Sequence, residues 1–402
     1  MKTIYYRITL HEPTILTQIE GEPNSAVSYD FIPGSVLRGI VISMYGELNL
    51  NAKTVKRLFF SNKTRFLNAY PVINDKRSLP VPISWRKAKY GDANTIYDEA
   101  LSQKQTDEKM SPVRGFVITD NDIAYIYQPK RVLNVHMQRA RKNADEQLVY
   151  RYDALAPQQT FEAMIYCQDD DVDMLTSLLH NKHAHIGRAR SAGYGKVSIH
   201  SINKDDTSWI TETMPQPKSD MIITLLSDVI VRDANGQYSP TLSAFMDAMK
   251  NREMKCELHP EATHQNKNSH DDSVIRTIHA IQTTLIGGFN RKWGLPLPQT
   301  PALKRGSVIH LINVDWDNEH FDKIIEGGIG ERCNEGFGQI AVNWQAHATL
   351  ELPENKKSEV SESPDIPEPV FVEKSDDERV WLMLKKGLER LKEGGKKDEQ
   401  PK

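Results

Sequence analysis

Hydrophobic and polar residues alternate along the chain with two different periods. Runs rich in β-branched and aromatic residues predict strands at 3–17, 159–166 and 221–231. Residues 113–127 predict a hairpin whose tip is the polar stretch 119–122. Apolar positions at helical spacing, preceded by turn or capping residues, predict helices at 35–45, 173–180, 241–250 and 321–325. Strands and helices of this kind together predict a mixed α+β protein.

One short glycine-bearing segment occurs twice. Residues 186–199 and 329–342 align without a gap, with an aromatic residue in matching positions, Tyr194 and Phe337. The three glycines of each copy also coincide: Gly187, Gly193, Gly195 and Gly330, Gly336, Gly338. A match at one fixed offset indicates internal duplication, so we expect two related domains.

Each copy predicts an irregular loop that leads into a strand. Glycine allows positive φ and has no Cβ, so the backbone amides of such a loop can face a phosphate. The first copy adds Arg188, Arg190 and Ser191, whereas the second has Arg332 between two glutamates. Because acidic side chains repel phosphate, we expect the first loop to hold more of a polyanion. The alternative is that both segments are ordinary turns.

Two further stretches suit a nucleic-acid backbone. Gly34 forms a turn after Pro33, and Ser35 is a plausible N-cap, so the first helical turn offers free amides beside Arg38. The alternative here is a plain capped helix. The most basic stretch interleaves cations with aromatic residues and a histidine, which suits phosphates and bases, although a solvated charged face is equally compatible. Its candidate contacts are Arg131, His136, Arg139 and Arg141.

A third stretch, 286–309, combines an amide, cations and an indole. Such a set can hold a phosphate and stack a base. The candidates are Asn290, Arg291, Lys292, Trp293, Lys304 and Arg305. The histidines His259, His264 and His270 lie in a polar loop at a spacing that favours flexibility over a metal site, so no metal is expected.

Composition excludes several classes of protein. The longest apolar runs are far too short to span a bilayer, and no secretory signal is evident at the N-terminus. Three widely spaced cysteines argue against a disulfide framework and fit a reducing, cytoplasmic location. The formal net charge is −3, so any polyanion site must come from local clustering of cations. No cofactor is implied.

The predicted elements follow the same order in each half: strand, helix, strands, helix, strand. That is the order of a ferredoxin-like, RRM-like βαββαβ unit. We therefore expect two tandem ferredoxin-like domains with long insertions, at 1–205 and 220–348. Residues 349–402 have linker composition, with a possible short helix at 379–391, and are expected to be a flexible tail.

With these motifs placed, the chain resembles the RAMP superfamily of CRISPR-associated proteins. The resemblance rests on the glycine loops, the turn at Gly34 and the segment Gly288–Pro298 followed by Gly306-Ser307-Val308. It covers roughly 1–345. That last segment is similar to the subgroup that caps the 5′ end of guide RNA in type III effectors, and most like its type III-D member.

The resemblance implies a division of labour. Such a subunit binds the repeat-derived 5′ handle of the crRNA and contacts the large polymerase-cyclase subunit and the backbone RAMP subunits. Carried over by position, the three glycines of each loop and the Gly34-Ser35 turn match the family pattern. The basic residues around His136 lie in no matching motif.

Some relatives in this superfamily mature guide RNA by metal-free cleavage, which needs an acid and a base. Histidine suits both tasks near neutral pH, and the candidates are His136 and His185. Neither has a catalytic companion recognisable in the sequence, and a lone histidine near phosphate is more often a binding group. We expect a non-catalytic RNA-binding subunit. A metal-independent endoribonuclease and a protein-only scaffold stay open as alternatives.

Overall fold

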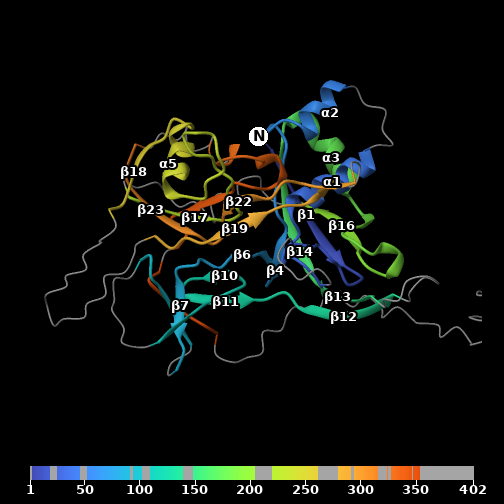
Figure 1. The fold of residues 1–402 in the computed structure, drawn as a ribbon, viewed down its shortest axis with the longest axis horizontal. Helices are drawn as coiled ribbons and strands as arrows, with labels where there is room; N and C mark the ends of the chain where they lie inside the picture. Colours follow the sequence, from blue (N-terminus) through green and yellow to red (C-terminus); the bar gives the residue numbers. More distant parts are fainter. Residues whose placement is uncertain are drawn as a thin grey trace, which may run out of the picture. The chain divides into compact units, whose positions relative to one another are not determined.

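The computed structural model describes most of the chain up to residue 353. The described residues are 2–353 without 19–24, 46–51, 91–93, 102–108, 139–147, 204–219, 261–278, 291–293, 316–323, 325–326 and 346. Residues 1–360 form one compact unit, and the tail prediction for 354–402 lies outside the described residues. The protein is mixed α+β and rich in strands (Figure 1).

The first half is built on one antiparallel sheet in the order β15-β16-β1-β14-β4-β5, with β3 also paired to β14. Its strands are β1 Lys2–Leu10, β3 Arg65–Phe66, β4 Tyr70–Ile73, β5 Lys76–Arg77, β14 Thr160–Cys167, β15 Lys182–His185 and β16 Lys196–Ile202. In the centre of the sheet, Ile8 lies opposite Phe161 on one side and Ile199 on the other. The strands predicted at 3–17 and 159–166 are confirmed as β1, which ends already at Leu10, and β14, and the structure pairs the two.

Three helices cover one face of this sheet (Figure 1): α1 Gly34–Tyr45, α2 Ala52–Phe59 and α3 Val172–Leu179. Leu37, Leu58 and Leu175 pack there against the apolar side chains of β1 and β14. Helix α1 begins at Gly34, one residue before the predicted N-cap, because the Gly34 amide donates to Oδ1 of Asn68 at 2.8 Å. That bond satisfies one of the free amides of the first turn from outside the helix.

The second half repeats this arrangement with β18-β23-β17-β24. Its elements are β17 Met221–Leu225, α5 Leu242–Lys250, β18 Lys255–Leu258, β23 Val308–Asp315 and β24 Ile340–Val342. Thr241 caps α5 by accepting a hydrogen bond from the Ala244 amide, as the sequence predicts. The helix expected at 321–325 falls almost wholly outside the described residues.

Both halves therefore share one strand order. In each half, the first strand of the sequence is paired with the last strand on one side and with the third strand on the other. The second strand pairs with the free side of the third. In the first half these are β1, β16, β14 and β3–β4, and in the second β17, β24, β23 and β18. All of these pairings are antiparallel.

The two halves bury a common core. Tyr5, Met164 and Tyr166 of the first half pack in the same cluster as Met221 and Ile223 of the second. Polar links add to this contact, because Nη2 of Arg305 lies 2.5 Å from Asp30 and the Tyr70 hydroxyl donates to the Leu226 carbonyl. The two halves are therefore joined by both apolar and polar contacts.

A further sheet is built from six strands inserted between the second and third strands of the first half, together with β25 from after the second half. Its order is β6-β10-β11-β25-β8-β7-β9. The strands are β6 Leu79–Pro80, β7 Trp85–Ala88, β8 Thr95–Asp98, β9 Met110–Pro112, β10 Phe116–Asp120, β11 Ile123–Tyr127 and β25 Thr349–Glu351. Strands β10 and β11 confirm the predicted hairpin, and the polar stretch 86–110 contains β8 and parts of β7 and β9.

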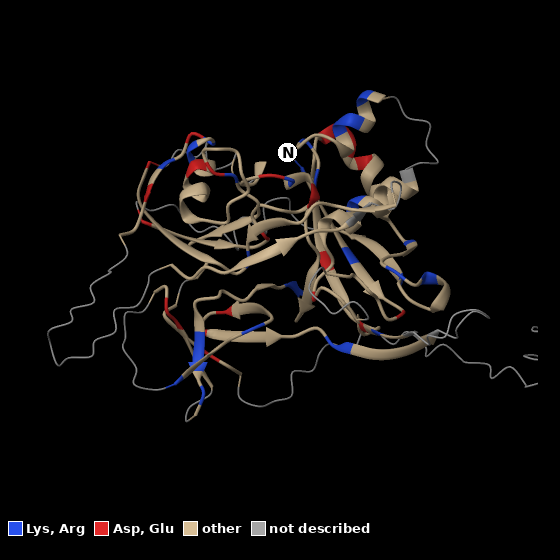
Figure 2. Ribbon diagram, in the orientation of Figure 1, with Lys and Arg blue, Asp and Glu red and all other residues tan. Residues whose placement is uncertain are grey.

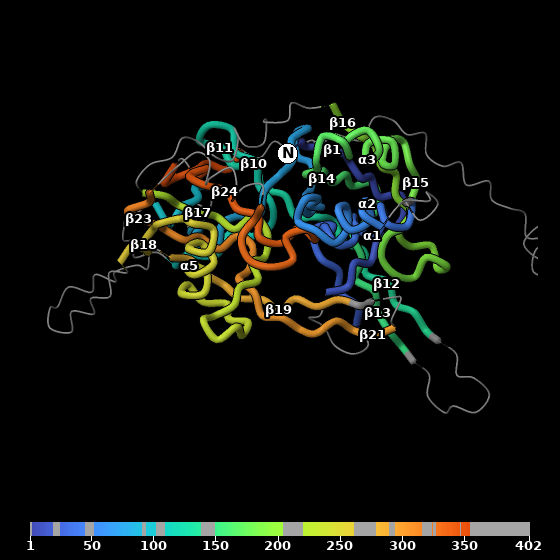
Figure 3. The backbone as a smooth tube through the Cα atoms, turned by 90° about the horizontal axis from the view of Figure 1, so that it is seen from above, coloured from blue at the N-terminus to red at the C-terminus, as the bar shows by residue number. Residues whose placement is uncertain are grey.

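Each half also carries an inserted hairpin just before its third strand. In the first half β12 Arg131–Gln138 pairs with β13 Leu148–Leu155, and β13 also pairs with β2 Ser25–Val27. In the second half β19 Thr283–Ile286 pairs with β22 Thr300–Leu303, and β20 Phe289–Asn290 with β21 Leu295–Pro296. Figure 3 shows the first hairpin in green-cyan and the second in orange.

Candidate nucleic-acid interface

The two glycine loops have the same backbone conformation. Ala189 and Arg332 adopt left-handed conformations, with φ of 58° and 56°. A short 3-10 turn follows in each, Arg190–Ala192 and Cys333–Glu335, and the three glycines of each loop all have positive φ. The sequence duplication is thus a structural duplication, residue for residue.

Close backbone contacts explain two glycines in each loop. A Cβ on Gly187 would lie 2.1 Å from the Ile15 carbonyl oxygen, and one on Gly330 would lie 2.2 Å from the Ile230 oxygen. A Cβ on Gly195 or on Gly338 would lie 2.1 Å from a carbonyl oxygen of its own loop. These distances exclude any side chain, so the glycines allow each loop to dock on the segment after the first strand of its half.

Two backbone amides of the first loop, which the sequence analysis expected to face a phosphate, instead bond to the segment after β1. The Arg188 amide donates to the Ile15 carbonyl at 3.2 Å, and the Gly195 amide donates to Pro13 at 2.9 Å. These two amides therefore serve the fold. What the first loop offers a ligand is the side chains of Arg188, Arg190 and Ser191, all of which are exposed.

The second loop packs against the first half. Nε of the buried Arg65 donates to the Cys333 carbonyl at 3.3 Å, and Nδ2 of Asn334 donates to Phe59 at 3.3 Å. A Cβ on Gly34 would lie 2.6 Å from the Glu335 oxygen, so the start of α1 lies directly against this loop. Part of the second loop is therefore occupied by protein contacts.

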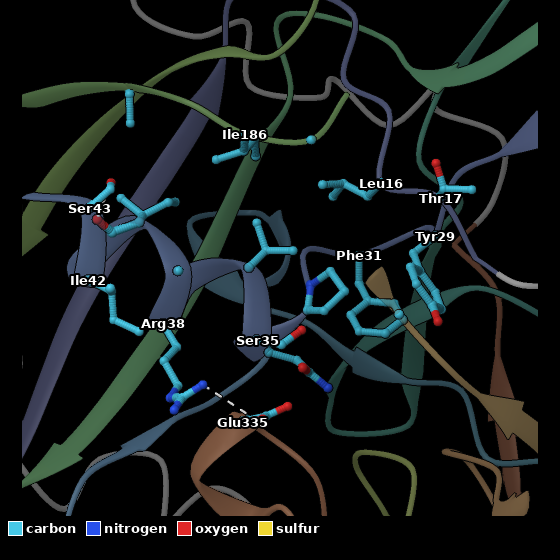
Figure 4. Close-up of a pocket in the computed structure, with 18 of the residues that line it drawn as sticks. Leu16, Thr17, Tyr29, Phe31, Ser35, Arg38, Ile42, Ser43, Ile186 and Glu335 are labelled. Carbon is cyan, nitrogen blue, oxygen red and sulfur yellow. Dashed lines mark hydrogen bonds and ion pairs between the residues drawn. The ribbon is translucent and has the colours of Figure 1, made fainter. Parts of the chain in front are cut away.

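A groove of about 1440 Å³ brings these parts together. Helix α1, strand β15, both glycine loops and the second hairpin contribute to its lining. Its cationic and histidine side chains are Arg38, Lys182, His183, His185, Arg188, Arg190 and Arg332. Figure 4 shows Ser35 and Arg38 on one wall, Ile186 across from them, and Arg38 directed at Glu335.

The charges of the groove are unevenly balanced. Glu335 lies 3.6 Å from Nη1 of Arg38 and 2.6 Å from Nη2 of Arg332, so one carboxylate serves two guanidinium groups. Arg332 also lies 4.9 Å from the Phe337 ring centroid. Within the described part of the chain no ion pair holds Arg188 or Arg190. Among the lining residues, Arg38, Lys182, Arg188, Arg190 and Arg332 outnumber the two acidic residues Asp228 and Glu335. Figure 2 shows where Lys and Arg lie along the ribbon.

Asp228 is the second acidic residue in the lining, and it is buried. Its Oδ1 accepts a hydrogen bond from the Arg305 amide at 2.8 Å. Burial raises the pKa of the Asp228 carboxyl, although Arg305 opposes this.

The aromatic residue of the first loop links the loop to the first hairpin. The Tyr194 hydroxyl accepts from Nδ2 of Asn134 at 2.8 Å and lies 2.9 Å from Nε2 of His136. His136 also stacks on Tyr150, with centroids 5.4 Å apart. His136 is therefore engaged by protein groups. The opposite face of β12 exposes Leu133, Val135 and Met137.

Other predicted contacts serve internal roles. Arg131 pairs with Asp153 at 2.7 Å, and Arg305 pairs with Asp30 while lying 4.3 Å from the Phe31 ring centroid. Lys304 is 3.5 Å from Oε1 of Gln282. Asn290 lies in β20, and Arg139, Arg141, Arg291, Lys292 and Trp293 lie outside the described residues.

Sequence reasoning missed part of the groove. Lys182, His183, Ile42 and Phe60 all line it, and Phe60 is 69% exposed. The only sequence feature that could have indicated a role for Phe60 is its place as an aromatic residue directly after a polar helix. Its position beside Arg38 follows only from the fold.

The structure gives no indication of a metal centre or a membrane span in the residues it describes. No group of three or more His, Cys, Asp or Glu side chains there is placed to hold a metal ion, and no described helix is long and apolar enough to cross a bilayer. His259 stacks on His310, with ring centroids 4.7 Å apart, while His264 and His270 are not among the described residues. The three cysteines are free and buried.

Comparisons with known proteins find similarity only among solved structures. No protein-family model and no curated protein matches the chain. A chain in the cryo-EM structure of the type III-B Cmr-beta bound to cognate target RNA is similar, at 10% identity and TM-score 0.42, over 76% of this chain and 86% of that one. A structure described as an RAMP protein binding different RNA substrates gives 10% identity and TM-score 0.36, over 85% and 99%. A Cas6-related protein from Pyrococcus furiosus gives 10% and 0.34, over 85% and 98%. All three TM-scores are below 0.5, so these likenesses carry no argument about function.

Proposed function

We propose that this chain is a RAMP-type, non-catalytic RNA-binding subunit of a type III CRISPR effector. In this proposal it consists of two tandem ferredoxin-like units and holds the repeat-derived 5′ handle of the crRNA. It contacts the large polymerase-cyclase subunit and the backbone subunits, in a III-D-like assembly. The shared strand order of the two halves, each with a glycine loop before its last strand, supports the family resemblance.

The single observation that carries the proposal is the cationic groove beside the first loop. Arg188 and Arg190 are exposed and have no ion pair among the described residues, while Glu335 is neutralised from both sides. Guanidinium groups bind phosphate oxygens in a bidentate manner, which suits an RNA backbone. The groove, of about 1440 Å³, is lined by residues from both halves.

The non-catalytic role is supported by the state of the candidate histidines. Nε2 of His136 lies beside the Tyr194 hydroxyl and its ring stacks on Tyr150, contacts that give this histidine a structural role in joining the first hairpin to the first loop. One observation favours the metal-independent endoribonuclease as second candidate: His183 and His185 lie on the same strand and both line the groove. An acid and a base from these two residues would suit such cleavage.

Binding of a labelled repeat-containing RNA, measured by fluorescence anisotropy across a salt series, tests the proposal. We expect Arg188→Glu with Arg190→Glu to weaken binding at least about ten-fold and to lower the salt slope by about 1.4, because two phosphate contacts are lost. The matched control is Lys89→Glu with Lys109→Glu, which makes the same charge change at exposed positions outside the groove. An equal loss in both double variants would refute the assignment of the groove.

The same RNA, incubated with the protein in chelator, separates the alternatives. We expect it to stay intact. Discrete cleavage that disappears in His183→Ala with His185→Ala would establish the nuclease instead. If the protein binds no RNA at moderate salt, the protein-only scaffold would be the remaining interpretation.

A further inference from the structure

Phe60 is a large aromatic side chain left open to solvent inside the cationic groove. It follows directly on α2, its amide donates to the Lys56 carbonyl at 3.0 Å, and its side chain is 69% exposed. Single exposed apolar residues are common on protein surfaces. Phe60 differs because it lines the groove, where Ile42 of α1 is the other exposed large apolar residue among those described.

Arg38 fixes the environment of this ring. Its Nε donates to the Phe59 carbonyl at 3.0 Å, and its guanidinium carbon lies 5.6 Å from the Phe60 ring centroid. Glu335 approaches the same guanidinium from the other side at 3.6 Å, as Figure 4 shows. Arg38 is therefore held in place by protein groups, and it supports the Phe60 ring rather than moving freely over it.

The neighbourhood of the ring defines what can bind it. Around the groove lie Lys182, Arg188 and Arg190, so an occupant carries negative charge. An exposed ring attracts a flat apolar surface, and stacking on aromatic side chains is how proteins hold unpaired bases. A single-stranded nucleic acid combines negative charge with flat aromatic bases and so matches both features of the groove.

We propose that Phe60, supported by Arg38, is a stacking site for one unpaired base of the RNA whose backbone contacts the first glycine loop. This inference rests on the proposed function, because it requires RNA in the groove. It adds a contact that does not depend on charge. The base is held by Phe60 while phosphates on the same strand contact Arg188 and Arg190.

Short single-stranded RNAs that each carry 2-aminopurine at one position test the proposal, because stacking on a ring quenches the fluorescence of this base. We expect one position to be quenched by the native protein. Phe60→Ala and Phe60→Leu should remove that quench and weaken binding about ten-fold, whereas Phe60→Tyr should preserve both. The salt slope should be unchanged in all three variants, since no charge is removed.

Tyr90 provides a matched control. It is also 69% exposed and lies 5.6 Å from the Nζ of Lys89, but it is outside the groove. Tyr90→Ala should change neither quench nor affinity. Native-like RNA binding and quenching by Phe60→Ala would overturn the stacking site and leave the proposed function intact. Failure of the native protein to bind any of these RNAs would overturn the proposed function itself.

Discussion

At the scale of single residues, the glycines of the two loops have different tasks. Gly195 and Gly338 lie where a Cβ would overlap a carbonyl oxygen, whereas a Cβ on Gly193 would meet nothing within 4 Å. All three have positive φ. Close packing therefore requires glycine at 195 and 338, whereas only the backbone conformation favours glycine at 193.

This difference predicts unequal losses of stability. Gly195→Ala should lower the free energy of unfolding by about 3 kcal/mol or more, because backbone must move. Gly193→Ala should cost only about 1 kcal/mol, from the left-handed conformation. Urea denaturation of both variants measures the difference. Similar losses would show that the backbone contact at Gly195 is not as close as described.

At the scale of elements, each loop is attached to the hairpin inserted in its own half. Tyr194 contacts Asn134 and His136 of β12 through its hydroxyl, while Phe337, its counterpart, packs by its ring near Ile286 and Ala302. Thr14 and Leu155 exchange backbone hydrogen bonds in the first half, and Val229 and Leu303 do so in the second. The duplication thus includes the hairpins, and in the first half side-chain hydrogen bonds from Tyr194 add to the backbone pairing.

Tyr194→Phe should loosen the first hairpin selectively. Loss of the hydroxyl removes two hydrogen bonds, worth about 1 kcal/mol each. Hydrogen–deuterium exchange should become faster in β12 and β13 and stay unchanged in β19 and β22, which serve as the internal control. Equal acceleration in both hairpins would indicate a global effect and contradict this attachment.

The sequence predicted those elements whose signals are local. Thr241 before α5 and the polar tip of the β10–β11 hairpin are examples, since capping and turn chemistry need only neighbouring residues. Strand β8 was missed because it pairs with β25, more than two hundred positions away. Thr349–Glu351, assigned to the tail, form that partner strand, and Leu350 is buried. The groove was predicted only in part, since Arg38, Phe60, Arg188 and Arg332 come from four separate segments.

At the scale of the whole molecule, the two halves share a core rather than meeting at a wet surface. Tyr5, Met164 and Tyr166 would be exposed if the first half stood alone. The Arg305–Asp30 pair and the bond from Arg65 to Cys333 also join residues from opposite halves. The groove exists only when the two halves are packed together, because residues of both halves line it.

Shared burial predicts that residues 2–353 unfold as one unit. Differential scanning calorimetry should show a single transition whose calorimetric and van't Hoff enthalpies agree. Two well-separated transitions would mean that the halves are independent domains, and the groove would then be an interface that opens easily.

The central claim is that RNA lies in the groove between the first glycine loop and α1. Photo-crosslinking of a bound repeat-containing RNA substituted with 4-thiouridine, followed by peptide mapping, tests it most directly. We predict crosslinks to peptides that carry Phe60 and residues 182–190, and their loss in Arg188→Glu with Arg190→Glu. Crosslinks confined to peptides outside the groove, such as those of β7 to β11, and unaffected by that double variant would contradict the account.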